Sequence, residues 1–167
     1  PVLFNGRRYV GTGVARSITG FGFQPDMVWI EARSNTYGPR LADSVRGSIK
    51  SVRPHLSDAE TSDAAIFSSF DTDGFSLGTN GTVNGNAVTF IAWGWKAGGA
   101  PSADDKKMVD GVESAITGTG AEDIRQSVNT AGGFCITKYV SSSDETITIP
   151  HNLGATPEFV ISKRLTA

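Results

Sequence analysis

The stretch GFGFQPDMVWIEAR, residues 20 to 33, carries the clearest fold signal in the sequence. Its glycines and Pro25 favour a loop, and the residues that follow, Met27 to Ile30, are an apolar run that includes strong strand formers. A continuous apolar run of this length predicts a strand that is buried on both faces of a sheet. The stretch therefore predicts a turn that leads into a core β-strand.

A second stretch, HNLGATPEFVISKR at residues 151 to 164, repeats this pattern. When Pro157 is aligned with Pro25, the glycine before the proline, the acidic residue after it and the valine of the strand all recur. Upstream of each proline lies a matching Tyr-Val pair, at Tyr9 and at Tyr139. Self-similarity at a long spacing indicates duplicated structural units. We expect a first β unit at residues 1–98, a linker or insert at 99–131, and the start of a second, incomplete β unit at 132–167.

The segment NAVTFIAWGWK is the second strong strand signal. Ile91 and Trp93 fall on one face of this strand, while Phe90 and Ala92 fall on the other. Both faces are largely apolar, which predicts a central strand in a pair of packed sheets. The composition, with 20 glycines and 19% charged residues, is typical of a loop-rich β protein. We expect an all-β chain, an antiparallel β-sandwich of jelly-roll or concanavalin-like type, with a partial second repeat.

Charge and hydropathy exclude several classes of partner. The formal net charge is -2 and no basic stripe is present, so we expect no binding to nucleic acid. No apolar run approaches the roughly 20 residues of a membrane span, and we expect no membrane insertion. Residues 1–10 lack the apolar segment of a signal peptide. The single cysteine, Cys135, allows no disulfide within the chain and is best interpreted as a small buried apolar residue.

Patterns for catalysis or metal binding are weak. Asp71 and Asp73 resemble the first ligands of a calcium loop, but Thr82 stands where an EF-hand requires glutamate. We therefore interpret DTDG, like TNGTVNGN, as turn sequence. His55 and His151 have no partners at zinc-site spacing, and no G-x-S-x-G motif occurs. We expect no catalytic residue, no cofactor and no metal ion.

Four aromatic residues are candidates for contact with a glycan, because aromatic rings can stack on the apolar faces of sugars. These residues are Trp29, Trp93, Trp95 and Tyr37. The three tryptophans lie in the strongest predicted strands, and for each of them packing in the core is the favoured interpretation.

The motifs GFQPDMVWIEAR, LADSVRG, FDTDGFSLG and VNGNAVTFIAWGWKAGG, in this order, resemble a known family. The family is the repeated, lectin-like β domain at the ends of bacteriophage tail and fibre proteins, especially those of marine phages. GGFCITKYV and IPHNLGATPEFVISKR supply the same likeness in the second copy, and roughly residues 100–128 fall outside it. The lysine usual after the first V-x-I strand is replaced here by Glu31 and Ala32, which weakens any argument from a basic residue at that place.

The resemblance implies a structural role in the virion, on a tail fibre, tailspike or capsid surface, and no enzyme activity. We therefore expect a structural component of a bacteriophage virion that contributes to host attachment. Its expected partners are other virion proteins, further copies of itself as a homo-oligomer, and a host-surface glycan. The unfinished second unit could be completed by a strand from a neighbouring subunit.

Two alternatives stay open. The first is a carbohydrate-binding module that has no place in a virion. The second is a polysaccharide depolymerase carried on a fibre, which would need two carboxylates about 5–10 Å apart across a groove. The acidic candidates are Asp26, Glu31, Asp43, Asp71 and Asp73, and no pair among them stands out.

Overall fold

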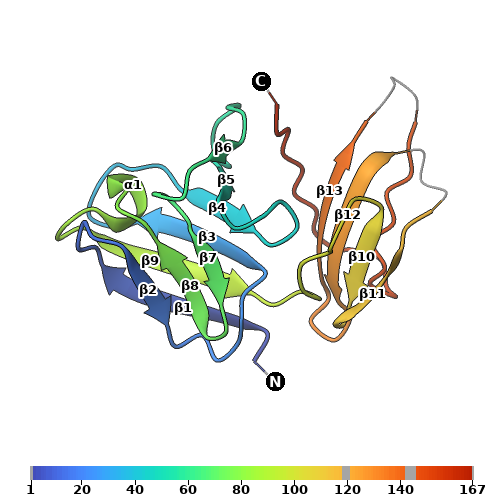
Figure 1. Ribbon diagram of the computed structural model, residues 1–167, viewed down its shortest axis with the longest axis horizontal. Helices are drawn as coiled ribbons and strands as arrows, with labels where there is room; N and C mark the ends of the chain where they lie inside the picture. The colour runs from blue at the N-terminus through green and yellow to red at the C-terminus, as the bar shows by residue number, and fades with distance from the viewer. Residues whose placement is uncertain (1, 118–120, 142–145, 167) are drawn as a thin grey trace.

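Two facing β-sheets form the body of the computed structural model, which describes residues 2–117, 121–141 and 146–166 (Figure 1). The strands of the larger sheet are β1 (Phe4–Val10), β9 (Thr89–Trp95), β3 (Met27–Ala32), β4 (Arg40–Asp43), β5 (Lys50–Val52) and β6 (Thr61–Ser62), paired in that order. The strands of the smaller sheet are β2 (Arg16–Thr19), β8 (Gly74–Leu77) and β7 (Ser69–Asp71), also in pairing order. All strand pairs within these two sheets are antiparallel.

The core between these two sheets is rich in phenylalanine. Phe75 of β8 is fully buried; its ring stacks on Phe67 at 5.3 Å between centroids and meets Phe21 in an edge contact at 5.7 Å. Alternate residues of the larger sheet face these rings, among them Val28, Ile30, Phe90 and Ala92. The two layers therefore share one hydrophobic core in a sandwich-like arrangement. The prediction of an all-β chain is confirmed, and the predicted antiparallel pairing holds throughout these two sheets.

The two strands with the strongest sequence signals lie side by side in the middle of the larger sheet. β9 pairs with β1 on one side and β3 on the other, as expected for a central strand. On β3, however, Val28 and Ile30 are buried whereas Trp29 is only half-buried. The expectation that this strand is buried on both faces was therefore wrong, because the smaller sheet covers only one face of the larger sheet.

The glycine turn before β3 is held by an aspartate from the DTDG segment. Gly20 and Gly22 have positive φ angles of 94° and 81°, which favour glycine. Their N–H groups donate to the carboxylate of Asp73, at 2.9 and 2.6 Å. These hydrogen bonds, first that of Gly22 and then that of Gly20, lower the pKa of Asp73. DTDG is thus a turn, as predicted, and it also fixes the conformation of a second turn.

Asp26 ties the start of β3 to two other segments. Its buried carboxylate accepts hydrogen bonds from the Ser44 hydroxyl at 2.9 Å and from the Ala97 N–H at 2.8 Å. Burial raises the pKa of Asp26, and the hydrogen bonds from Ser44 and Ala97 oppose that shift. Because the pKa in the folded state lies above the ordinary value, this group adds stability at low pH that is lost as the pH rises through the raised pKa.

The only helix among the described residues is one turn long. α1 (Gly81–Asn84) is capped by Asn80, whose side-chain oxygen accepts from the Thr82 N–H at 3.0 Å. The segment TNGTVNGN, predicted as a turn between strands, therefore forms a capped helical turn, because asparagine is as effective at a helix N-cap as in a hairpin. No helix in the described ranges is long and apolar enough to span a membrane.

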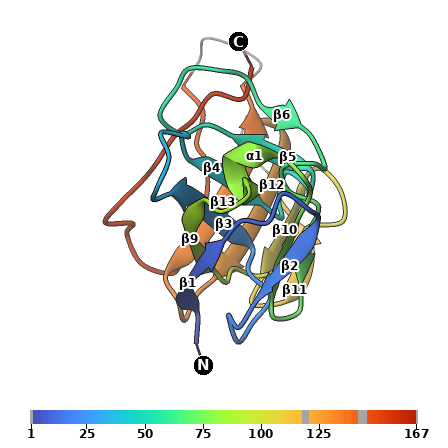
Figure 2. The same ribbon diagram turned by 90° about the vertical axis from the view of Figure 1, so that its left-hand side faces the viewer.

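A third sheet lies at one end of the sandwich, beside it in Figure 1 and behind it in Figure 2. Its strands, in pairing order, are β11 (Val112–Ala115), β10 (Lys106–Val109), β12 (Glu122–Asn129) and β13 (Phe134–Val140). Residues 99–131, expected as a linker or insert, therefore contain three strands. They form one sheet with β13 at the start of the second unit, and β12 is the strand that pairs with β13. The buried face of β12 includes Gln126 as well as Ile124 and Val128. Because a polar residue stands among the buried positions, the sequence of β12 does not alternate between apolar and polar residues as a predictable strand would.

The two copies of the sequence repeat have different structures. β13 (FCITKYV) corresponds in sequence to β1 (FNGRRYV), and both are strands of seven residues. The counterpart of β3 is not a strand. Phe159, Val160 and Ile161 are 80%, 75% and 59% exposed. The segment leads from the four-stranded sheet to the loop before β6, where Leu165 accepts a backbone hydrogen bond from Glu60 at 2.8 Å.

Candidate functional site

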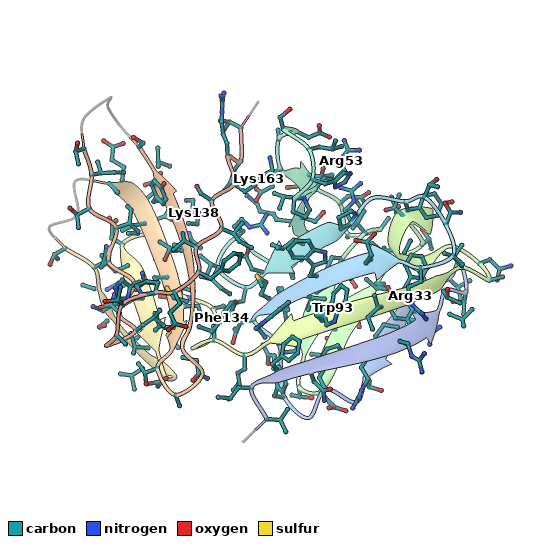
Figure 3. All side chains as sticks on the ribbon, turned by 180° about the vertical axis from the view of Figure 1, so that it is seen from behind. Arg33, Arg53, Trp93, Phe134, Lys138 and Lys163 are labelled. Carbon is teal, nitrogen blue, oxygen red and sulfur yellow. The ribbon has the colours of Figure 1, made fainter. Side chains whose placement is uncertain are left out.

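The larger sheet presents an outward surface, here called the outer face, on the side away from the smaller sheet. Trp29 of β3 lies opposite Trp93 of β9, which in turn lies opposite Gly6 of β1. Figure 3 shows Trp93 on this face. All three tryptophans are half-buried and none belongs to the core cluster. Trp29 and Trp93 therefore do not have the core positions that were favoured for them, since Phe90, Ala92 and their neighbours on β3 already fill the inward side.

Trp93 lies close to the backbone of β1 because Gly6, opposite it, has no side chain. A Cβ atom added at Gly6 would lie only 3.3 Å from Cδ1 of Trp93. The indole thus rests over Gly6, where the Cβ of another residue would make a tight contact and require the ring to shift by a few tenths of an ångström. This arrangement gives Trp93 a fixed position on the outer face while leaving it partly accessible, as a ring that stacks on a ligand requires.

The other two candidates have different surroundings. Trp95 lies between Phe4, at 4.9 Å between ring centroids, and Phe134, at 6.1 Å. It therefore packs where the sandwich meets the four-stranded sheet. The hydroxyl of Tyr37 lies close to Gly81 in α1. The structure thus brings Trp29 and Trp93 together as neighbours, gives Trp95 a packing role and places Tyr37 next to the helical turn.

A shallow depression of about 260 Å³ lies between the end of β1 and the start of β9. Its lining residues are Arg8, Tyr9, Val10, Arg33, Thr89 and Phe90. Arg8 and Arg33 form no ion pair with any residue that the structure describes. Sequence reasoning missed both arginines. For Arg33 a signal was present, because residues 29, 31 and 33 alternate onto one face, whereas Arg8 joins them only through the strand register.

The acidic candidates for a depolymerase are mostly engaged in structural contacts. Asp26 is buried and hydrogen-bonded, and Asp43 forms an ion pair with a buried arginine. Asp71 accepts hydrogen bonds from the hydroxyls of Ser69 and Ser76, both at 2.7 Å. Asp73 holds the glycine turn already described. By strand register only Glu31 and Asp43 of the five belong to the outer side of the larger sheet. Asp43 is buried in its ion pair with Arg46, so among the described residues Glu31 faces no free carboxylate of this set.

The histidines and the cysteine occupy local structural positions. The ring of His55 lies against Gly38, and Nδ1 of His151 accepts a hydrogen bond from the Leu153 N–H at 3.2 Å. Cys135 is half-buried, and burial raises the pKa of its thiol, which disfavours the reactive thiolate. Within residues 2–117, 121–141 and 146–166 there is no group of three His, Cys, Asp or Glu side chains that could hold a metal ion.

Comparison with known proteins places the chain in one family. No curated protein and no solved structure matches it significantly. The model of the family described as domain of unknown function DUF7483 matches residues 2–167. Because this match covers nearly the whole sequence, the chain belongs to the DUF7483 family.

Proposed function

We propose that this chain is a structural component of a bacteriophage virion that contributes to host attachment by binding surface glycan through Trp29 and Trp93. The order of the sequence motifs supports the virion role by resemblance. The observation that carries the attachment role is the placement of Trp93 over Gly6, in register with Trp29, on the outer face. Two neighbouring indoles that stay partly exposed on one sheet face form a continuous apolar surface, which supports a contact role.

Glycan is the partner class that fits this surface best. Indole rings offer a flat apolar surface to the C–H groups of a sugar ring, and neighbouring polar side chains can bind its hydroxyls. Glu31 and Arg8 lie next to the indoles, in the neighbouring row of paired residues across the sheet, since both are opposite Ile91 of β9. The alternative of a carbohydrate-binding module outside a virion shares this site and differs only in location. A depolymerase has less support, because four of its five candidate carboxylates are engaged elsewhere.

Location in the particle is tested by immunogold electron microscopy. Antibodies raised against the purified chain are expected to label intact phage particles produced by the genome that encodes it, at the tail or on the capsid surface. Preimmune serum is the control. Unlabelled particles, in a lysate where the chain is detected by immunoblotting, would contradict the virion role and favour the free carbohydrate-binding module.

Self-association is the second part of the proposal, and it rests on the unpaired residues 158–162. No backbone group of this segment forms a hydrogen bond with a described residue. Its counterpart β3 is paired on both sides, with β4 and β9. An extended apolar segment of this kind can add to a free sheet edge of another copy, where main-chain hydrogen bonds provide the affinity.

The variant Val160→Lys tests the self-association. Wild-type chain at about 100 μM is expected to sediment as a dimer or larger oligomer, whereas V160K should sediment as a monomer because a charge replaces a 75% exposed apolar contact residue. Val14→Lys, at a site 63% exposed in a loop of the first unit, is the matched control and should keep the wild-type mass. A monomeric wild type, or equal masses for V160K and wild type, would contradict strand addition through this segment.

A further inference from the structure

We propose that the glycan is anionic, and that it lies along β9 from the Trp93 platform to the depression between Arg8 and Arg33. This inference rests on the proposed glycan-binding function and specifies the chemical class of the ligand. The strip defined by Trp93, Ile91, Thr89, Arg8 and Arg33 is called the cationic strip below. Figure 3 shows Trp93 and Arg33 at separate places along the same side of the sheet.

The geometry of the strip follows from the strand register. Trp93, Ile91 and Thr89 are alternate residues of β9 and point to the outer face. Arg8 lies opposite Ile91, and the Arg33 N–H donates to the Thr89 carbonyl at 2.7 Å. At about 3.3 Å per residue, Trp93 and Thr89 are separated by about 13 Å. That length accommodates more than one sugar ring, so a polymer stacked on Trp93 reaches the arginines.

The charge of the strip indicates which sugars fit. Arg46, Arg53 and Arg125 each form an ion pair with a carboxylate. Arg8 and Arg33, by contrast, flank a depression and have no such partner among the described residues. A guanidinium group binds a carboxylate or sulfate through two parallel hydrogen bonds that are charge-assisted, and a neutral sugar lacks the negative charge that strengthens them.

Glu31 restricts where such a ligand can lie. It lies in the same row of paired residues across the sheet as Arg8, with Ile91 between them. At this row, Glu31 repels an anionic chain from the β3 side and Arg8 attracts it to the β1 side. The polymer is therefore directed over β9 and β1 beside Ile91. It meets Arg33, which follows β3, only at Thr89, two residues beyond Ile91 along β9.

Affinity electrophoresis of the purified chain tests the ligand class with three defined polymers. Dextran sulfate and polygalacturonate, which carry sulfate and carboxylate groups, are expected to retard the native protein, and dextran is expected to retard it far less. The double variant R8Q/R33Q should lose about tenfold or more in affinity for both anionic polymers, because each guanidinium–anion contact is charge-assisted. Trp93→Ala should lose affinity for the same polymers, and Arg53→Gln is the matched control that should bind as wild type.

The outcomes separate this inference from the function on which it rests. If dextran retards the wild type as strongly as dextran sulfate, and only Trp93→Ala binds less, the glycan-binding face stands and the anionic class is wrong. Equal binding by R8Q/R33Q and wild type would overturn the assignment of the strip. Equal retardation by single-stranded DNA would show attraction to any polyanion and would also overturn it. Far-ultraviolet circular dichroism of each variant verifies that it is folded.

Discussion

Replacing Arg46 by alanine is expected to lower the free energy of unfolding by about 3–5 kcal/mol, because it removes the cation of a buried ion network. Nε of Arg46 contacts Asp43 at 2.6 Å, Nη1 contacts Glu60 at 3.0 Å, and Nη2 donates to the Leu41 carbonyl at 3.2 Å. The side chains of Arg46 and Asp43 are only 6% and 5% exposed. Without Arg46, Asp43 is left as a buried carboxylate with no countercharge. Urea denaturation followed by tryptophan fluorescence measures the loss.

A matched control lies in the next loop. Arg53 forms an ion pair with Asp58, but these side chains are 41% and 35% exposed. Arg53→Ala is therefore expected to change the free energy of unfolding by less than about 1 kcal/mol. Equal effects of the two variants would contradict the interpretation of LADSVRG as a structural motif whose aspartate and arginine act as a buried pair.

The sandwich could be predicted from sequence because its strands follow the simple period of two. On β9 the inward residues Phe90 and Ala92 are apolar, and the glycine turn before β3 needs residues that tolerate positive φ. Such local rules act within a few residues and are visible in any single sequence. The repeat was detectable for the same reason, since β13 keeps the pattern of β1.

The strands β10, β11 and β12 escaped prediction because the interior of the four-stranded sheet is partly polar. Gln126 is fully buried, yet its amide donates to the Thr137 hydroxyl at 3.0 Å and to the Pro150 carbonyl. The N–H of Gly98 donates to the buried hydroxyl of Ser127 at 2.9 Å. These partners are distant in sequence, so residues that are satisfied in the fold look like loop residues in isolation.

The outer face was only half predictable. Alternation assigned Trp93 and Phe90 to opposite faces of one strand, but it could not show which face the smaller sheet covers. Arg8 and Trp93 come together only through the pairing of β1 with β9, which joins residues far apart in the chain. Period-two patterns therefore predict the sides of a strand, while the second layer and the register decide which side becomes a binding surface.

Replacing Phe75 by alanine is expected to lower the free energy of unfolding by about 3–5 kcal/mol, through the lost burial and the cavity that remains. Its ring joins the two layers, because it lies on β8 and contacts Phe67 and Phe21 within the core shared with the larger sheet. Phe159→Ala removes the same number of atoms from a ring that is 80% exposed, and it is expected to cost less than about 1 kcal/mol. Thermal and urea unfolding of the two variants provide the comparison.

The Phe75 variant also tests whether the outer face depends on the second layer. Phe75 has no place on the outer face, so any loss of glycan binding by Phe75→Ala must come through the fold. We expect binding to persist at temperatures where this variant is still folded, and to disappear in the same transition that unfolds it. Loss of binding well below that transition would instead mean that the packing of β8 against the larger sheet positions Trp29 and Trp93. A destabilisation below about 1 kcal/mol would contradict the two-layer core itself.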